Sequence, residues 1–311
     1  MKLSIIATLY RSARDLAEFH RRAMRAAEAL TSDIEMILVD DGSPDDSLDI
    51  ALRLQRDDPR IVVAELARNF GHHRAMMTGL AYATGDLVLL IDSDLEEPPE
   101  LLAIFHERLV AGNWDVVYGV QADRRGGFIQ RVTGEAFFKM TELLSDHPLP
   151  RNVITARLMR RAYVDALVAH RDRSFLIAHL WSIAGFRQTA MEVTKLSLSP
   201  TTYSLCRRVE MGIQHVTTTS TKILYLIFYA GSGISGVALA LMLFFLIRYL
   251  RQGVGVGGWT SLFLSLWFFG GVIIQILGIL GLYIANIYQE VKERPYTHLR
   301  RLHGGGQGGE G

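Results

Sequence analysis

Cysteine is almost absent from this chain of 311 residues. Cys206 is the only one, so no disulfide can form within the chain. This suits a reducing compartment, although it does not prove one. Hydrophobic residues make up 49% of the sequence, which is enough to build a core without crosslinks, in one large domain or two smaller ones.

Net charge is nearly absent too. The chain carries 33 Lys and Arg residues against 32 Asp and Glu residues, a formal net charge of +1. Proteins that follow the phosphates of nucleic acids usually carry a large basic excess. The composition therefore argues against a nucleic-acid partner.

Two long stretches lack charged residues altogether. Residues 223–247 and 259–288 contain no Asp, Glu, Lys or Arg over 25 and 30 positions. About 20 helical residues cross a bilayer core of ~30 Å, whereas an apolar run in a soluble core helix is nearer 12 residues long. Within residues 222–289 the sequence predicts two transmembrane helices, at about 223–247 and 260–288, that form a hairpin.

The N-terminus lacks the features of a signal peptide. In MKLSIIATLYRS the apolar run is short and is interrupted early by polar residues. We therefore expect residues 1–200 to stay in the cytoplasm. The Lys and Arg residues that flank the hairpin favour both of its ends inside, which makes residues 290–311 a cytoplasmic tail that finishes in a flexible GGGQGGEG.

Residues 201–221 leave two interpretations open. Leu205, Val209, Ile213 and Val216 recur at helical spacing, as in an amphipathic juxtamembrane helix on the bilayer surface. A plain linker helix would show the same spacing.

Strands and helices alternate along residues 1–200. Expected strands are LSIIATLY (3–10), EMILVDDGS (35–43), IVVAEL (61–66), DLVLLIDSD (86–94) and WDVVYGV (114–120), with helices at 12–30, 72–83 and after residue 101. This order is typical of an α/β domain with a mostly parallel sheet that is covered on both faces, and such sheets bind ligands at the carboxyl ends of their strands. From there to about residue 200 the pattern is less regular and rich in arginine.

An acidic stretch, LLIDSDLEEPPE, ends one of these strands. Asp92 and Asp94 lie two apart, so a turn can bring both carboxylates to one point. Such pairs suit Mg²⁺ or Mn²⁺, and Mg²⁺ in particular is often completed by substrate phosphates. The alternative is an acidic turn before a helix that begins at Pro98 and Pro99.

A second acidic stretch, VDDGSPDDS, follows another strand. Asp40 and Asp41 can accept hydrogen bonds from a ribose hydroxyl or a base N–H, but they do not favour bare phosphates. Asp45, Asp46 and Ser47 are better explained as the cap of the next helix. Together the two stretches indicate a nucleotide whose phosphates are bridged by a metal ion.

The order and spacing of LSIIATLYRS, VDDGSPDDS, RNFGHHRAMMTGLAYATGD and LLIDSDLEEPPE resemble the family 2 glycosyltransferases, which have a GT-A fold. The two apolar spans and VYGVQADRRGGFIQRVTGEAFFKM are similar to the bacterial polyprenyl-phosphate glycosyltransferases. Dolichyl-phosphate mannosyltransferase and the undecaprenyl-phosphate aminoarabinose-pathway transferase belong to the same group. The likeness extends to about residue 300.

The resemblance implies roles for the acidic residues and for the loop after the third strand. Asp92 and Asp94 would hold the metal, and Glu96 stands where relatives often place Gln as a further metal contact. The donor nucleotide would be bound by Asp40, Asp41, Asn69, Gly71 and Asp92. His72 and His73 could touch a phosphate, but we favour ordinary packed or solvated histidines there.

A basic segment resembles the part of relatives that grips the lipid phosphate. It contains Arg124, Arg125, Arg131 and Thr133. Guanidinium groups suit this task because they bind phosphate oxygens bidentately and keep their charge. A solvated basic face remains the alternative for Arg124 and Arg125. The resemblance implies that Asp94, Arg124 and Arg131 are the catalytic residues.

The activity implied by the resemblance is transfer of a sugar from UDP or another nucleoside diphosphate to undecaprenyl phosphate, with inversion, in a multi-pass protein of the bacterial inner membrane. We also expect a homo-oligomer, such as the tetramer that bacterial relatives suggest. Two positions depart from the family pattern: Thr155 replaces an Asp, and Thr202 replaces a Lys. Three alternatives are a catalytically silent nucleotide-sugar-binding protein, a polysaccharide synthase with another acceptor, and a metal-dependent phosphatase.

Overall fold

The structure is a computed structural model. It describes residues 1–121, 152–170, 175, 177–193 and 259–304, and scattered residues between 222 and 251. The chain divides into two compact units. The first contains the described residues up to 193 together with 294–304, and the second contains those from 222 to 293.

The first unit is built from eight strands and six helices within the described residues. The strands are β1 (Leu3–Leu9), β2 (Ile34–Asp40), β3 (Ile61–Leu66), β4 (Leu87–Leu90), β5 (Val116–Gln121), β6 (Val153–Arg160), β7 (Gln188–Val193) and β8 (Leu299–His303). The helices are α1 (Leu16–Glu28), α2 (Ser47–Asp57), α3 (His72–Tyr82), α4 (Leu101–Ala111), α6 (Arg161–Ala169) and α7 (Ile177–Ile183).

All eight strands form one sheet in the order β7-β5-β6-β4-β1-β2-β3-β8. Strands β1 to β4 are mutually parallel, whereas β6 runs antiparallel to β4 and β8 antiparallel to β3. The carboxyl ends of β2 and β4 therefore lie on either side of the carboxyl end of β1.

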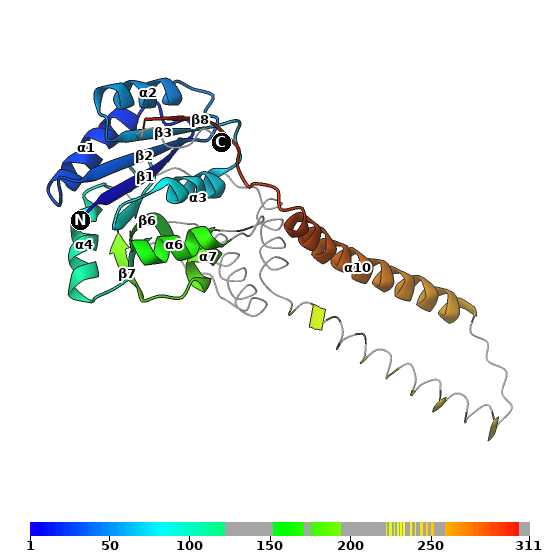
Figure 1. Cartoon of the computed structure of the whole chain (residues 1–311). Helices are drawn as coiled ribbons and strands as arrows, with labels where there is room; N and C mark the ends of the chain where they lie inside the picture. Colours follow the sequence, from blue (N-terminus) through cyan, green and yellow to red (C-terminus); the bar gives the residue numbers. More distant parts are fainter. Residues whose placement is uncertain are drawn as a thin grey trace. The chain divides into compact units, whose positions relative to one another are not determined.

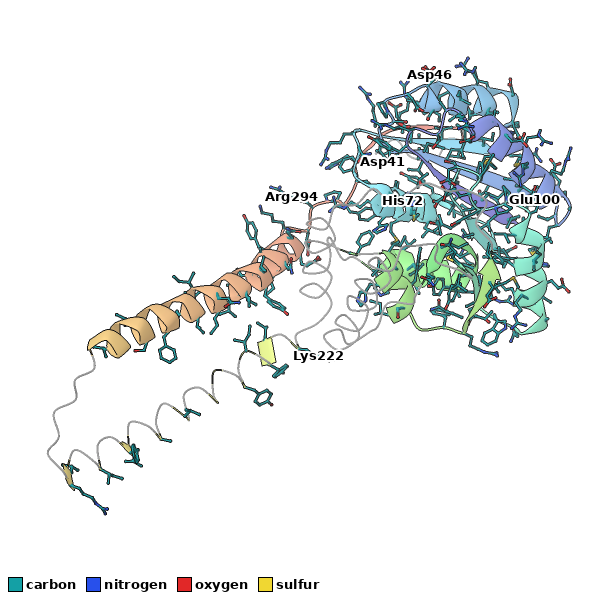
Figure 2. The ribbon with its side chains drawn as sticks, turned by 180° about the vertical axis from the view of Figure 1, so that it is seen from behind. Asp41, Asp46, His72, Glu100, Lys222 and Arg294 are labelled. Atoms are coloured by element: carbon teal, nitrogen blue, oxygen red, sulfur yellow. The ribbon has the colours of Figure 1, made fainter. Side chains whose placement is uncertain are left out.

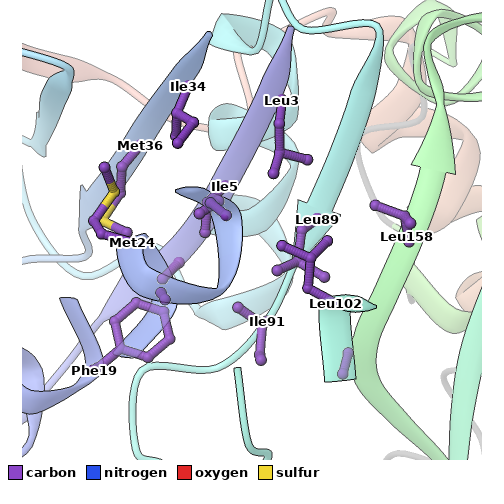
Figure 3. Packing of buried hydrophobic residues seen from close by; sticks show 14 of the residues in the cluster. Leu3, Ile5, Phe19, Met24, Ile34, Met36, Leu89, Ile91, Leu102 and Leu158 are labelled. Carbon is purple, nitrogen blue, oxygen red and sulfur yellow. The ribbon is translucent and has the colours of Figure 1, made fainter. Parts of the chain in front are cut away.

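Helices cover both faces of the sheet, as Figure 1 shows. On one face, apolar side chains of α1, α2 and α4 pack with alternate strand residues such as Leu3, Ile5 and Met36 (Figure 3). On the other, α3, α6 and α7 pack against Ile6, Ile37 and their neighbours. Because both faces are buried, β1 consists of seven buried residues in a row and lacks the polar alternation of a half-exposed strand.

The expected α/β architecture with a mostly parallel sheet is confirmed. The expectation that the chain becomes irregular after β5 is wrong for its described residues, because β6, α6, α7 and β7 complete the sheet and its cover. In β6 the charged Arg157 is buried among apolar residues, which obscures the apolar pattern of that strand. Residues 299–303, which the sequence places in the tail, form β8 at the sheet edge.

The second unit contains the helix α10 (Trp259–Val291). Within it, Val272–Val291 has a mean hydropathy of 1.7 and none of it is buried in the protein. It is the one helix among the described residues that is long and apolar enough to cross a membrane. The other expected span, 223–247, is described only at scattered positions, and 201–221 lies outside the described residues, so the hairpin and the juxtamembrane helix remain predictions.

Candidate active site

The candidate site lies at the carboxyl ends of β1, β2 and β4. Asp40 pairs in register with Leu9 at the end of β1, and the N–H of Asp41 donates to the carbonyl of Leu9 at 3.0 Å. On the other side of β1, the N–H of Ile91 donates to the carbonyl of Ile6 at 3.1 Å. The two acidic stretches therefore leave the sheet on either side of one central strand.

Asp40 is almost fully buried, at 2% exposure. Its Oδ1 accepts a hydrogen bond from the N–H of Ser43 at 3.3 Å. Burial raises the pKa of Asp40 to about 6, and the charges of Glu65 and Asp41 push the pKa in the same direction. A carboxyl group held in this way can accept a hydrogen bond from a ribose or base without a cation beside it.

Asp41 is equally buried but is already engaged. Its carboxylate accepts the N–H of Phe70 at 2.7 Å and the N–H of Gly71 at 3.0 Å. Burial raises the pKa of Asp41, while these two bonds act against the rise. Asp41 therefore holds the loop between β3 and α3, and in this structure its contact is with that loop.

Glycines allow the two loops to approach closely. A Cβ atom on Gly42 would lie 2.6 Å from the backbone nitrogen of Asn69, and Gly42 has φ +62°. Gly71, with φ +100°, turns the chain into α3. The predicted residues Asn69 and Gly71 are thus brought beside Asp40 and Asp41.

The loop after β4 carries Asp92 and Asp94. Ser93 anchors it, since its hydroxyl donates to the carbonyl of Thr8 at 2.9 Å and lies 3.0 Å from the hydroxyl of Ser12. Asp94 is exposed, and its Oδ1 accepts the N–H of Glu96 at 3.0 Å. Leu95 adopts φ +59°, a conformation rarely adopted by a bulky side chain, so this turn carries backbone strain.

His72 connects this loop to α3. Its Nε2 lies 3.3 Å from Oδ1 of Asp92, and its Nδ1 lies 3.0 Å from the hydroxyl of Thr8 (His72 and Asp41 are labelled in Figure 2). Burial lowers the pKa of His72, but the bond and the charge of Asp92 outweigh it, so the pKa is raised. Burial lowers the pKa of the adjacent His73 to about 4. No local pattern in the sequence signals the contact of His72 with Asp92.

Carboxylate oxygens of Asp92 and Asp94 are the kind of ligand that Mg²⁺ and Mn²⁺ prefer. Among the described residues, no group of three or more His, Cys, Asp or Glu side chains is arranged to hold a metal ion. The pair on one loop fits a cation that takes its remaining ligands from phosphate and water. Glu96 follows on the same loop, and its role as a third ligand stays a prediction.

Glu97 ties the same loop to β6. Its side chain is fully buried, and its two oxygens accept the N–H of Thr155 at 3.1 Å and the N–H of Ala156 at 2.7 Å. Thr155 is therefore next to the acidic loop. The sequence gives no sign of this role, because a fourth carboxylate in an acidic run looks like solvated surface.

Arg157 lies two residues further along β6 and is 1% exposed. Its guanidinium stacks on the ring of Trp181, and its Nη2 has no hydrogen-bond partner among the described residues. Burial lowers the pKa of Arg157 to about 9, although the charge of Glu97 is among those that act to raise it. The sequence alone did not single out this buried cation.

Several predicted site residues lie outside the described residues. Arg124, Arg125, Arg131 and Thr133 are among them, as is Thr202.

Residues 4–168 match the family described as "Glycosyl transferase family 2". The chain belongs to glycosyl transferase family 2. It is also 45% identical, over 98% of this chain and 89% of the relative, to a protein of Mycobacterium tuberculosis (strain CDC 1551 / Oshkosh) that carries a glycosyltransferase name. The family assignment makes this protein a glycosyltransferase, and confirms the resemblance inferred from the motifs.

A second relative is the prophage bactoprenol glucosyl transferase homolog of Escherichia coli (strain K12). It is 28% identical over 97% of this chain and 99% of its own length. Among solved structures, the chain is similar to the mannosyltransferase PcManGT from Pyrobaculum calidifontis in complex with GDP-Man and Mn²⁺, with 16% identity, a TM-score of 0.49, and coverage of 94% of this chain and 86% of that one. At this identity and TM-score, the likeness adds nothing to the assignment.

Proposed function

We propose that this family 2 glycosyltransferase transfers a sugar from a nucleoside diphosphate to a polyprenyl phosphate such as undecaprenyl phosphate. The observation that carries the donor half is the arrangement of Asp40 on one side of β1 and of Asp92 and Asp94 on the other. The name of the Escherichia coli relative, a bactoprenol glucosyl transferase homolog, supports the acceptor half.

In the proposed mechanism, Asp40 accepts a hydrogen bond from the donor nucleoside, and Asp41 keeps the loop at residues 69–71 beside it. Asp92 and Asp94 would hold Mg²⁺ or Mn²⁺, which supplies charge stabilisation for the departing nucleoside diphosphate. Arg124, Arg125, Arg131 and Thr133 are proposed to hold the acceptor phosphate.

The acceptor needs no general base. A phosphate monoester has a second pKa of ~6 and is largely dianionic at neutral pH, so it can attack the anomeric carbon directly. The phosphate oxygen forms the new bond, the bond to the nucleoside diphosphate breaks, and a single displacement inverts the anomeric centre. Thr155 in place of an Asp is therefore compatible with catalysis.

Membrane attachment is part of the proposal, and β8 supports it. The segment between residues 202 and 294 leaves the first unit and returns to it, because β8 pairs with β3. If α10 crosses a bilayer once, a return to the same side requires an even number of crossings. One further span before residue 259, as in the predicted hairpin, would make the number of crossings even.

The test is incubation of membranes containing the protein with Mn²⁺, undecaprenyl phosphate and a panel of nucleotide sugars, with the lipid product read by mass spectrometry. Asp94→Ala should abolish product, because the metal loses a carboxylate. Asp46→Asn is the control, since this exposed carboxylate lies at the start of α2 and makes no capping bond. An unchanged rate in Asp94→Ala would rule out the metal role, and free sugar or phosphate as the product would favour a phosphatase.

We further propose that Thr155 and Thr202 adapt the enzyme to an unusual sugar, since both replace charged residues of relatives at positions associated with substrate. The panel should then contain a donor that outperforms UDP-glucose and GDP-mannose. Efficient turnover of either of these, with no better donor, would contradict the hypothesis. Loss of turnover with all donors but retained nucleotide-sugar binding would favour a silent binding protein.

A further inference from the structure

The segment 294–304, which follows α10, packs beside the donor half of the site. Strand β8 pairs with β3 through Ala64 and Leu302 and through Glu65 and Arg301 (Figure 1). Beyond the strand, the N–H of Ala67 donates to the carbonyl of His298 at 2.9 Å. Backbone pairing therefore extends into the loop that leads from β3 to α3.

Side chains of the segment contact helix α3 and the loop before it. The hydroxyl of Thr297 lies 2.9 Å from the hydroxyl of Thr78 on α3. The ring of His298 packs against the ring of Phe70, with centroids 6.0 Å apart. The loop 67–71 is thus held by the segment on one side.

The other side of the loop is held by Asp41, which accepts the N–H groups of Phe70 and Gly71. Phe70, the residue after Asn69, therefore contacts His298 through its ring and Asp41 through its backbone N–H. Movement of the segment would release the loop from one of its two supports.

The segment also adjusts the charge beside Asp40. Glu65 is opposite Asp40 in the register of β2 and β3. From the other side, β8 places Arg300 Nη1 3.3 Å and His303 Nε2 3.1 Å from the Glu65 carboxylate. These contacts offset a negative charge that would otherwise act more strongly on Asp40.

We propose that Thr297, His298, Arg300 and His303 of the segment 294–304 are positioning residues of the donor site, so that donor affinity depends on a strand that the chain supplies only after α10. This rests on the proposed nucleotide-sugar donor. Arg294 follows the last residue of α10, Val291, by three positions, so the donor loop is joined to that helix through a short connection. The segment is an integral part of the site.

The first test compares two truncations of the full chain in membranes. One ends after Glu293 and removes the segment; the other ends after Gly304 and keeps it. Using whichever of UDP-glucose, UDP-N-acetylglucosamine and GDP-mannose gives most product, the shorter chain should show a donor KM raised on the order of tenfold, because the ordered loop becomes a minor state. The acceptor KM should not change, and the longer chain should match the full-length protein.

A peptide of residues 294–304, added in trans, should lower the raised donor KM of the shorter chain by restoring the edge strand. Equal donor KM values for the two truncations would overturn the proposal.

Point variants keep the proposal testable if the shorter chain does not fold. Arg300→Gln should raise the donor KM about 2–5-fold, the range expected for loss of a partly exposed ion pair, with kcat unchanged. Arg300→Lys should restore it. Arg301→Gln is the matched control, since the described structure gives this exposed side chain no ion pair with Glu65.

Equal effects of Arg300→Gln and Arg301→Gln on the donor KM, or an equal fall of kcat in both, would overturn the positioning role. Failure of the proposed function would look different. In that case the full-length protein itself would give no lipid product with any donor.

Discussion

At the scale of single residues, the site combines buried carboxylates with strained turns. Asp40, Asp41 and Glu97 are each almost fully withdrawn from water, yet each is bonded to a backbone N–H. Burial of a charge costs free energy, and hydrogen bonds to the charged form recover part of that cost. For Asp40 the hydrogen bonds offset only part of the free-energy cost of burying the charge, so its pKa remains raised.

Asp40 should therefore make the folded protein less stable as pH rises. Its pKa is 3.8 ordinarily and about 6 in the folded protein, so the folded state binds the proton more tightly than the unfolded chain. The contribution of Asp40 to the free energy of unfolding falls as pH rises from 3.8 to 6, by up to about 3 kcal/mol, and stays low above pH 6. Asp40→Asn removes this charge but keeps an oxygen that can accept from Ser43.

The expected result is a thermal midpoint for Asp40→Asn that exceeds the wild type at pH 7.5 by more than it does at pH 4.5. The measurement is thermal unfolding at both pH values, with Asp33→Asn, an exposed carboxylate, as control. A difference that is the same at both pH values would show that Asp40 does not titrate in this window. Donor KM should rise in Asp40→Asn if this carboxylate binds the nucleoside.

At the scale of elements, helix α3 sets the geometry of the site because it packs closely on the sheet. A Cβ atom on Gly79 would lie 2.4 Å from Cγ2 of Ile6 and 3.1 Å from Cγ2 of Val39. Gly79 therefore lets α3 approach β1 and β2 closely. The same close approach brings His72, at the start of α3, within reach of Asp92 and Thr8.

Gly79→Ala should destabilise the protein by about 1–2 kcal/mol, because the added methyl group overpacks the contact by more than the gain in helix propensity. Ile6→Ala removes Cγ2, the atom that the added methyl group would meet. In a double-mutant cycle, Gly79→Ala should therefore destabilise the Ile6→Ala protein by less than it destabilises the wild type. Denaturant unfolding of the four proteins measures this. Gly278→Ala, on α10 with no described atom within 4 Å of the new methyl group, serves as control.

Whole-molecule organisation follows from the return of the chain to its first unit. Strand β8 completes the sheet edge that β3 would otherwise expose, and exposed strand edges favour unwanted pairing with other chains. On the proposed membrane attachment, the segment between residues 202 and 294 is an insertion within this unit. An odd number of crossings would then be incompatible with the pairing of β8 and β3.

Cysteine labelling can check the parity of crossings, since Cys206 is the only cysteine. In a Cys206→Ser background, Gln307→Cys beyond β8 and Asp33→Cys in the first unit should be protected from a membrane-impermeant maleimide in intact cells. Arg251→Cys, between the two expected spans, should be labelled. Labelling of Gln307→Cys but not Asp33→Cys would contradict an even number of crossings.

Much of the fold could be predicted because its signals are local. The buried strands β1 to β4 are apolar runs of the right length, helix α1 has a clear apolar period, and the acidic residues stand directly after strands. The parallel alternation then places Asp40, Asp92 and Asp94 at one edge of the sheet. Family membership followed from the same motifs, because their order is a property of the chain.

Only the tertiary structure decided which distant residues meet. Three contacts join segments that are separated in sequence, and no local sequence pattern predicts them. They are the bond between Glu97 and β6, the stacking of Arg157 on Trp181 and the contact of His72 with Asp92. Strand β8 is the clearest case. Its five residues, LRRLH, resemble a basic tail, and they become a strand because β3 offers an unpaired edge that supplies their backbone hydrogen bonds.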